Sequence, residues 1–456
     1  MAAVLARATA AALAVAASLL LALACPASDA SGVEGSTVAS PLPPAPAPPV
    51  AFVDVSVVPM DAERVLEHRT VLVRDGRIAE VGPAGGVTVP EGALRVDGRG
   101  KYLMPGLADL HVHLRMRGDL TLYLANGVTT VLNMGGFNGA QLRAWRDSAR
   151  AGTMLGPELL VSYFLDGPGG RYGVLETVDD ARQAVRQAKR DGYDFLKVYN
   201  SLSAEQMAAI GDEARRQGLA VIGHGVRSVG LERGFELGQV MVAHAEEYIY
   251  VDFLSNAGMT VPRYAAAASY TRGAGAYVTP NLSAYDAITR QWGNPAQLEA
   301  YLARPEARYL DPYWREMWRT SDYVTRPGTL GDRIDRLKRL TKELSDSGVP
   351  LLLGTDSPGI PGVFPGFSID DDLRLMVEAG LTPYQALAAG TRTAGEFVAR
   401  TVPDAEPFGT VAPGRRADLL LLDGNPLRAL APVARPAGVM LRGRWLPRST
   451  LDGMLE

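Results

Sequence analysis

The sequence predicts an α/β protein: a (β/α)8 barrel of the TIM type with a small β-sandwich built from both ends of the chain. Three observations predict this architecture. Apolar, strand-like runs alternate with helical patterns through the middle of the chain, which is typical of a parallel sheet covered on both sides. Blocks of short alternating β segments flank that middle. Histidines also stand at or near the ends of several apolar runs, where a barrel gathers side chains at one rim.

The N-terminal residues 1–25 have the composition of a secretory signal peptide. A single Arg7 precedes an apolar run of small residues that ends at Cys25, the only cysteine. The run is nearly long enough to span a bilayer, so an uncleaved anchor is the alternative. LALAC resembles a bacterial lipobox, and Cys25 is expected either to carry a lipid anchor or to be removed with the signal. We therefore expect an exported protein: a periplasmic or membrane-anchored lipoprotein, or a secreted one.

Residues 26–50 are rich in proline and alanine, which predicts an extended linker. Residues 51–104 then carry the β segments VAFVDVSVV, RTVLVRDGRIAEVG and ALRVDGRGKYLMPG, whose alternation and Asp-Gly turns predict hairpins. A matching block closes the chain at 401–456, with ADLLLLDGNP and AGVMLRGRWLP. We expect these two blocks to assemble into one sandwich.

The middle, 105–400, contains eight candidate strands. Helical patterns with start signals lie between most of them, such as Thr177 and the capping box of Ser203 with Gln206. An open doubly wound sheet is the alternative, but no Gly-rich phosphate loop follows an early strand. The candidate strands are GLADLHVHL, VTTVLNM, ELLVSYFL, DFLKVY, LAVIGHG, QVMVAHA, AYVTPNL and VPLLLGTDS.

The connection between the last two candidate strands, from Ala287 to Lys342, is unusually long. It holds Trp292, Trp314 and Trp318, three of the five tryptophans. On the carboxyl side of a barrel such a segment forms a lid or part of a substrate pocket. A packing or subunit-contact element is the alternative.

Composition excludes one class of partner. The formal net charge is −4 and no long basic run occurs, so nothing indicates a nucleic-acid surface.

Six residues at strand ends suggest a metal site. Imidazole is a good ligand for zinc, and His-X-His on a strand points both side chains to one face. A lysine among apolar neighbours is costly to bury as a cation, which indicates a lowered pKa or chemical conversion. One histidine alone would more often be a hydrogen-bonded core residue, but the shared placement argues against that. The residues are His111 and His113 on the first candidate strand, Lys197 on the fourth, His224 on the fifth, His244 on the sixth and Asp356 on the eighth.

The chain resembles the amidohydrolase superfamily of metal-dependent hydrolases, in particular its imidazolonepropionase- and prolidase-like branch. GKYLMPGLADLHVHL resembles that family's entry into the barrel, and GTDSPG its last strand. LTPYQALAAGTRTAGEF followed by GTVAPGRRADLLLLDGNP resembles its usual close. The resemblance covers essentially everything after the linker.

The resemblance implies a binuclear site. By that likeness His111, His113 and Asp356 bind one ion and His224 and His244 the other. Lys197, carboxylated to N6-carboxylysine, and a hydroxide bridge the two. Such a hydroxide is a nucleophile near neutral pH, and Asp356 would act as general acid and base. Zinc is the expected metal, with manganese or cobalt as alternatives.

Other residues are weaker candidates for substrate contacts. Tyr199 could donate a hydrogen bond to an oxyanion or a carboxylate. HAEEYIY departs from the commoner family pattern, in which glycine follows the sixth-strand histidine. Glu246, Glu247 and Tyr248 therefore either face the pocket or form loop salt bridges. Arg227 is an arginine candidate for holding a carboxylate, as are Arg115, Arg117 and Arg171.

These observations predict an exported enzyme that hydrolyses amide bonds in dipeptides, as a prolidase does, or in N-acyl amino acids. A cyclic amidase or lactonase is the alternative, because the same hydroxide attacks either carbonyl. A non-catalytic exported binding protein is an alternative of another class, disfavoured because no expected ligand is missing. A homo-oligomer is compatible with the resemblance. His68, in the first β block, is expected to lie outside the site.

Overall fold

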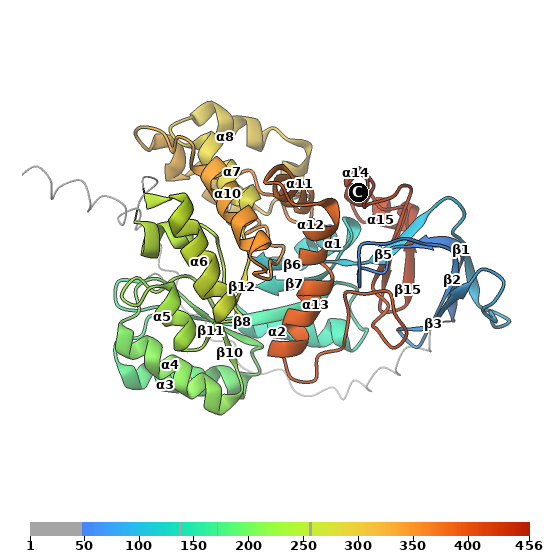
Figure 1. Ribbon diagram of the computed structural model, residues 1–456, viewed down its shortest axis with the longest axis horizontal. Helices are drawn as coiled ribbons and strands as arrows, with labels where there is room; N and C mark the ends of the chain where they lie inside the picture. The colour runs from blue at the N-terminus through green and yellow to red at the C-terminus, as the bar shows by residue number, and fades with distance from the viewer. Residues whose placement is uncertain (1–47, 136–137, 171, 255–257) are drawn as a thin grey trace, which may run out of the picture. The chain divides into compact units, whose positions relative to one another are not determined.

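A seven-stranded parallel sheet forms the middle of the chain (Figure 1). The computed structural model describes residues 48–135, 138–170, 172–254 and 258–456. The strands neighbour one another in chain order, and nearly all of their residues are buried because helices cover the sheet. They are β6 (Leu107–Val112), β7 (Val128–Asn133), β8 (Glu158–Leu165), β9 (Phe195–Val198), β10 (Ala220–Gly223), β11 (Gln239–Val242) and β12 (Tyr277–Val278).

The eighth predicted strand is an extended segment, 350–357, that joins the two edges of this sheet. Toward β12, the Leu352 N–H donates to the Val278 carbonyl at 2.8 Å. Toward β6, the Leu110 N–H donates to Leu353 and the His113 N–H to Ser357. Backbone pairing is too intermittent here for a regular strand, but these bonds complete a ring. The predicted barrel-like α/β fold is therefore confirmed, with an irregular eighth member.

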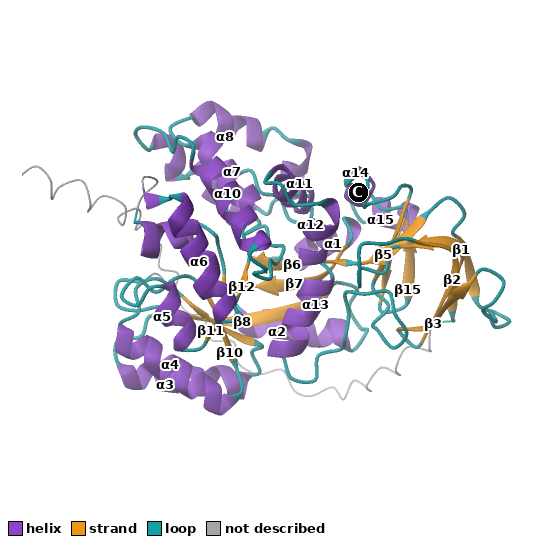
Figure 2. Cartoon of the chain, viewed as in Figure 1, coloured by secondary structure: helices purple, strands orange, loops and turns teal. Residues whose placement is uncertain are grey.

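Helices surround the strands, as Figure 2 shows. Two predicted helix starts are confirmed: Thr177 and Ser203 each form a capping box with the residue three positions on. The helices are α1 (Arg117–Ala125), α2 (Gly139–Arg150), α3 (Val178–Asp191), α4 (Ala204–Gln217), α5 (Leu231–Glu236), α6 (Val261–Gly273), α7 (Leu282–Gln291), α8 (Pro295–Leu302), α9 (Pro312–Arg319), α10 (Arg333–Asp346), α11 (Ile369–Glu378), α12 (Pro383–Ala389), α13 (Arg392–Thr401), α14 (Ala431–Ala434) and α15 (Arg448–Gly453).

Both ends of the described chain meet in one eight-stranded mixed sheet. The link between the ends is antiparallel pairing of β5 with β13, in which Leu103 opposes Leu421. This confirms that the two terminal blocks assemble together, whereas the second layer of a sandwich stays a prediction. The strands are β1 (Val50–Val57), β2 (Leu66–Arg74), β3 (Arg77–Pro83), β4 (Leu94–Asp97), β5 (Tyr102–Pro105), β13 (Leu419–Leu422), β14 (Gly438–Leu441) and β15 (Arg444–Pro447).

The long connection between β12 and the eighth segment folds into short helices that pack closely on the barrel. Trp318 of α9 is fully buried, and its indole N–H donates to the carbonyl of Pro358 at 2.8 Å. The predicted signal segment, Cys25 and nearly all of the linker lie outside the described residues. Within the described part of the chain, no helix combines the length and the apolar character needed to cross a membrane.

Candidate functional site

A pocket of about 270 Å³ opens where the barrel strands end. Five of the six residues predicted at strand ends line it. One lies on β9 and one in the eighth segment, and the other three lie just after β6, β10 and β11. The sixth, His111, is fully buried within contact distance of them. The lining members are His113, Lys197, His224, His244 and Asp356.

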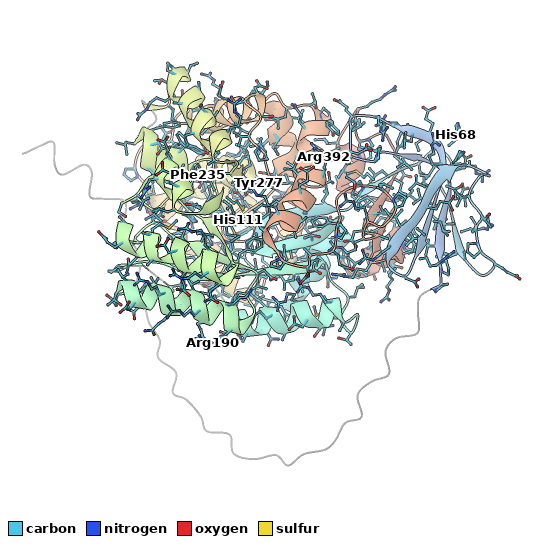
Figure 3. The ribbon with its side chains drawn as sticks, turned by 60° about the horizontal axis from the view of Figure 1, so that its bottom comes forward. His68, His111, Arg190, Phe235, Tyr277 and Arg392 are labelled. Carbon is cyan, nitrogen blue, oxygen red and sulfur yellow. The ribbon has the colours of Figure 1, made fainter. Side chains whose placement is uncertain are left out.

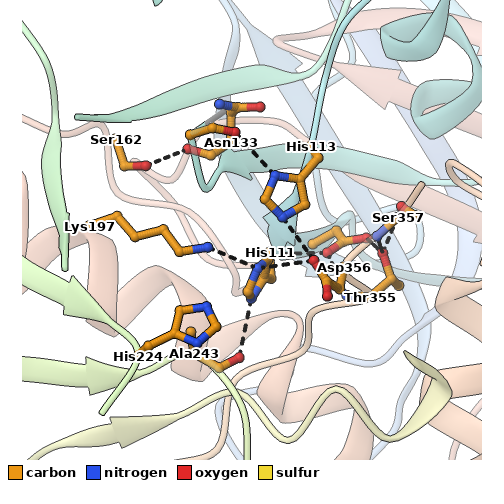
Figure 4. Close-up of polar contacts among 12 residues, drawn as sticks. His111, His113, Asn133, Ser162, Lys197, His224, Ala243, Thr355, Asp356 and Ser357 are labelled. Carbon is orange, nitrogen blue, oxygen red and sulfur yellow. Dashed lines mark hydrogen bonds and ion pairs between the residues drawn. The ribbon is translucent and has the colours of Figure 1, made fainter. Parts of the chain in front are cut away.

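His111, His113 and Asp356 form one close group (Figure 4). Oδ1 of Asp356 lies 2.8 Å from Nε2 of His113 and 3.3 Å from Nε2 of His111. The remaining ring nitrogens are directed at backbone: Nδ1 of His111 lies 3.2 Å from the Ala243 carbonyl and Nδ1 of His113 lies 3.1 Å from that of Gly135. Asp356 has a left-handed backbone, with φ of 64°, at the turn that ends the eighth segment. Both Nε2 atoms are thus directed at one carboxylate.

His224 and His244 form the neighbouring group. Their ring centroids are 4.8 Å apart, and the His244 ring lies 4.5 Å from that of His111. Nδ1 of His224 lies 2.6 Å from Oε1 of Glu247, a buried carboxylate whose other oxygen accepts from the Gly225 N–H. Glu247 therefore holds the His224 ring in place.

Lys197 lies between the two groups. Its side chain is 1% exposed, and Nζ is 3.5 Å from Nε2 of His111. Burial lowers the pKa of Lys197 to about 8, while the negative charges of Asp356 and Glu247 oppose that shift. Among the described residues, none forms an ion pair with it within 4 Å. Its charge is therefore poorly compensated.

The other charges favour metal binding. Burial lowers the pKa of His244 to about 3 and holds those of His111 and His224 well below their usual value, so these three imidazoles are neutral, the form that binds a metal. Burial works against ionisation of Asp356, but the adjacent imidazoles hold its pKa well below the usual range.

These residues fit a divalent cation. His111, His244 and Asp356 bring one ligand atom each to within 4.8 Å of one another. Nδ1 of His244 is buried and lacks a hydrogen-bond partner among the described residues. Neutral imidazoles beside an ionised carboxylate are the donor set of zinc sites.

The weaker candidates divide between the pocket and its surroundings. Tyr199 lines the pocket, and its ring lies 4.0 Å from that of His224. The other three candidates, Glu247, Tyr248 and Arg227, are not among the described residues that line the pocket. Glu247 acts behind His224, and the Tyr248 hydroxyl lies 2.7 Å from Oγ1 of Thr271 on α6.

The remaining charged candidates are accounted for elsewhere. Glu246 forms a buried salt bridge with Arg333 of α10 at 2.7 Å, as the loop alternative expected. Arg115 forms an ion pair with Asp311 at 3.5 Å. Arg117 and Arg227 are exposed, and Arg171 lies outside the described residues.

The pocket also contains residues that the sequence analysis did not single out. Asp166 directly follows β8, so the rule that found the histidines, a polar residue at the end of a strand, would have found it too. The other residues carry no such signal, because aromatic side chains are equally common in cores. They are Phe164, Tyr172, Tyr313 and Met317. Trp314, named above in the long connection that was expected to form a lid or a pocket element, also lines the pocket. Trp314 thereby connects the long segment to the pocket.

His68 provides an internal comparison. Figure 3 shows it on the mixed sheet, away from His111. Its side chain is 80% exposed and bonds Asp54 at 2.8 Å, as expected for a histidine without a role in the site.

Comparison with known sequences gives one match along most of the chain and several local ones. A model of the amidohydrolase family matches residues 102–446. Dihydroorotase from Anaeromyxobacter sp. (strain K) is 45% identical over 70 residues, 15% of this chain and 16% of that protein. Imidazolonepropionase from Stenotrophomonas maltophilia (strain R551-3) is 37% identical over 68 residues, 14% of this chain and 17% of that protein. The chain thus spans about a sixth of the length of these curated relatives.

Solved structures align over more of the chain. A proposed prolidase from Bifidobacterium longum aligns with a TM-score of 0.65 at 27% identity, covering 90% of this chain and 99% of that one. Bottromycin amidohydrolase aligns with a TM-score of 0.68 at 27% identity, covering 89% of this chain and 88% of that one.

Proposed function

The chain belongs to the amidohydrolase family, and from this premise we propose that it is a metal-dependent hydrolase that cleaves amide bonds in small substrates. The observation that carries the proposal is the convergence of four imidazoles, a buried lysine and an ionised carboxylate on one pocket. This combination serves hydrolysis, because a metal site beside an open pocket admits both water and substrate.

The proposed site holds two divalent ions, with zinc favoured by the ligands. His111, His113 and Asp356 would hold one ion, His224 and His244 the other, and Lys197 would contribute as N6-carboxylysine between them. When bound, the ions supply Lewis acidity and lower the pKa of coordinated water. The buried, uncompensated position of Lys197 supports its conversion to an anion.

The chain's own residues supply proton transfer and orientation. Asp356 is ionised and lines the pocket, so it can accept a proton and deliver it to a leaving amine. Burial and the charge of Glu247 raise the pKa of Tyr199, which keeps its hydroxyl protonated. Tyr199 can therefore donate a hydrogen bond to a substrate oxygen at the pocket wall.

Dipeptides, cleaved in the manner of a prolidase, and N-acyl amino acids are the favoured substrates. The alignment with the Bifidobacterium longum protein over nearly the whole of both chains supports this choice. A cyclic amide or a lactone is the second candidate, supported by the local match to dihydroorotase.

A substrate panel with metal analysis tests the function. We expect turnover of X-Pro, X-Arg, X-Lys or N-acyl dipeptides and two ions per chain in protein purified with bicarbonate. Turnover of lactones but of no dipeptide would contradict the peptidase proposal and support a lactonase instead. Fewer than two ions per chain would contradict the binuclear site. A metal-loaded protein that turns over none of these substrates would instead support the alternative of a non-catalytic binding protein.

Lys197→Ala tests the lysine. We expect activity to be lost, because the bridging anion is removed, and to return partly when acetate or propionate is added. Lys189→Ala, on the exposed side of α3, is the control and should keep full activity. Unchanged activity of Lys197→Ala would remove the lysine from the site.

We also propose export, with Cys25 as a lipid attachment site, on the strength of the apolar run and LALAC. Cys25→Ser should move the protein from the membrane fraction to the soluble fraction and abolish labelling by a palmitate analogue. A wild-type protein that is soluble, unlabelled and shortened at its N-terminus would indicate simple signal cleavage instead.

A further inference from the structure

Asp166 lies in the pocket wall but has no part in the metal site. The residue is 2% exposed and lines the same pocket as Lys197 and Asp356. The N–H groups of Gly167 and Ser201 both donate to its Oδ1, each at 2.9 Å. Among the described residues, no arginine or lysine forms an ion pair with it within 4 Å. Backbone donors therefore fix the orientation of this buried carboxylate, and it lacks an ion-pair partner among the residues that the structure describes.

The register of β8 and β9 shows how far Asp166 lies beyond Lys197 along the strand direction, toward the pocket mouth. Phe164 of β8 opposes Lys197 of β9. Asp166 is two residues farther along, so its side chain faces the same way as Phe164 and stands about 6.6 Å nearer the pocket mouth.

Aromatic side chains line the space around this carboxylate. The Phe164 ring lies 5.3 Å from that of Tyr199, and its centroid is 6.0 Å from Nζ of Lys197, a distance at which a cation is attracted to a ring. Trp314 and Met317 of α9 line the same pocket. Apolar walls that end at a carboxylate suit a long aliphatic group with a positive end.

We infer that Asp166 and the adjacent aromatic residues form a specificity subsite for a positively charged group of the substrate, an ammonium or a guanidinium on a flexible stem. This inference rests on the proposed amide hydrolysis. The backbone levels of Lys197 and Asp166 differ by about 6.6 Å along the strands, an offset comparable to the length of a lysine or arginine side chain. The α-ammonium group of a dipeptide lies only one carbon from the scissile carbonyl and does not span it.

The charges near the pocket agree with this assignment. Lys197 is the only lysine or arginine among the described lining residues, and it belongs to the proposed metal site. Burial raises the pKa of Asp166, and the hydrogen bonds from Ser201 and Gly167 and, last, the charge of Arg227, exposed in the loop after β10, oppose that rise. Arg227 forms no ion pair with Asp166 within 4 Å, so the carboxylate has no ion-pair partner among the described residues.

Charged and neutral isosteres test the subsite. The substrates are dipeptides with lysine or norleucine, and with arginine or citrulline, at either position. We expect wild-type kcat/KM to favour the cationic member by about 10- to 100-fold, the usual range for a charge-assisted hydrogen bond. In Asp166→Asn that ratio should fall to near unity. Asp179→Asn, exposed on α3, is the matched control and should keep the wild-type ratio.

Failure of the subsite and failure of the function give different results. Turnover of both members at equal rates by the wild type overturns the subsite and leaves amide hydrolysis standing. If no amide is cleaved, calorimetry with N-acetyl-lysine methylamide and its norleucine analogue measures the subsite directly. Tighter binding of the lysine compound, weakened by Asp166→Asn, supports it, and equal binding overturns it. The wild-type comparison decides even if the variant fails to fold.

Discussion

Glu247 shows how one buried residue can control a site without entering the pocket. Its two oxygens serve different partners: Oε1 contacts His224 at 2.6 Å, and Oε2 accepts from Gly225 and from Asn200 at 3.2 Å. A carboxylate that binds Nδ1 fixes the tautomer, so that Nε2 keeps its lone pair for a ligand. The unusual HAEE sequence therefore has a structural explanation, which is the orientation of His224.

Glu247→Gln should weaken metal binding. The amide cannot accept all three hydrogen bonds, so His224 loses its fixed orientation, and we expect metal affinity to fall by about 10- to 100-fold. Competition with a chromophoric chelator measures this without reference to turnover. Glu236→Gln, exposed on α5 beside Arg233, is the control. Equal metal affinities in the two variants would show that Glu247 does not affect metal binding through His224.

The site residues differ in how far the sequence could predict them. The four histidines, Lys197 and Asp356 were predictable because strand ends converge in a barrel, and their pocket is where that rule places it. Asp166 obeys the same rule but lacked a family motif. A pocket role was one of the two predictions for the long connection, but which of its residues line the pocket, such as Tyr313 and Met317, depends on how α9 packs.

Helix α9 is the element that turns the long connection into a pocket wall. Its N-cap, Asp311, accepts a hydrogen bond from the Trp314 N–H at 3.0 Å and forms an ion pair with Arg115. The Arg115 guanidinium in turn lies 4.2 Å from the centre of the Tyr313 ring. These contacts fix the first turn, which carries Tyr313 and Trp314. Of the two predicted roles for the connection, a pocket element is therefore the one that the geometry supports.

Asp311→Ala should loosen the pocket wall. Loss of an N-cap costs about 1 kcal/mol, which corresponds to about a fivefold rise in KM if the first turn must be ordered to bind substrate. The kcat should change little, because α9 holds no proposed metal ligand. Thr382→Ala, at the N-cap of α12, removes an equivalent bond and should leave KM unchanged. A rise in KM in both variants would indicate general destabilisation.

For the eighth barrel segment, the sequence predicts a buried strand but not the interruption of its backbone pairing. VPLLLGTDS has the apolar run of a buried strand, and its backbone does bond to both neighbours. Its regular pairing is interrupted, however, because Thr355 uses its N–H and hydroxyl to bond the buried carboxylate of Asp109. A side chain that competes with the sheet for backbone groups is not visible in a hydrophobic pattern.

At the scale of the whole molecule, charged residues join the mixed sheet to the barrel. Arg442, after β14, forms ion pairs with Glu406 at 2.6 Å and with Glu158 at the start of β8. Arg416 donates to Oγ1 of Thr130 on β7 at 2.8 Å. The sheet made from both chain ends is thus fixed to the barrel through residues distant in sequence, which no local pattern predicts.

Arg442→Met should destabilise the protein by about 2 kcal/mol. Glu158 would lose a buried partner, although Arg150 at 2.6 Å still compensates part of its charge. The midpoint of urea unfolding should fall accordingly. Arg444→Met, on the exposed side of β15, is the control and should leave the midpoint unchanged. Equal midpoints for the two variants would mean that the junction adds nothing to stability.

The segment that completes the barrel also sets a condition on biosynthesis. The ribosome makes His111 and His113 early, but Asp356 only after most of the barrel, and it reaches them through backbone bonds between 350–357 and β6. A nascent or truncated chain therefore presents imidazoles without the carboxylate that gathers them. In the proposed metal site, full metal retention would then require the finished chain, and metal content would report completed folding.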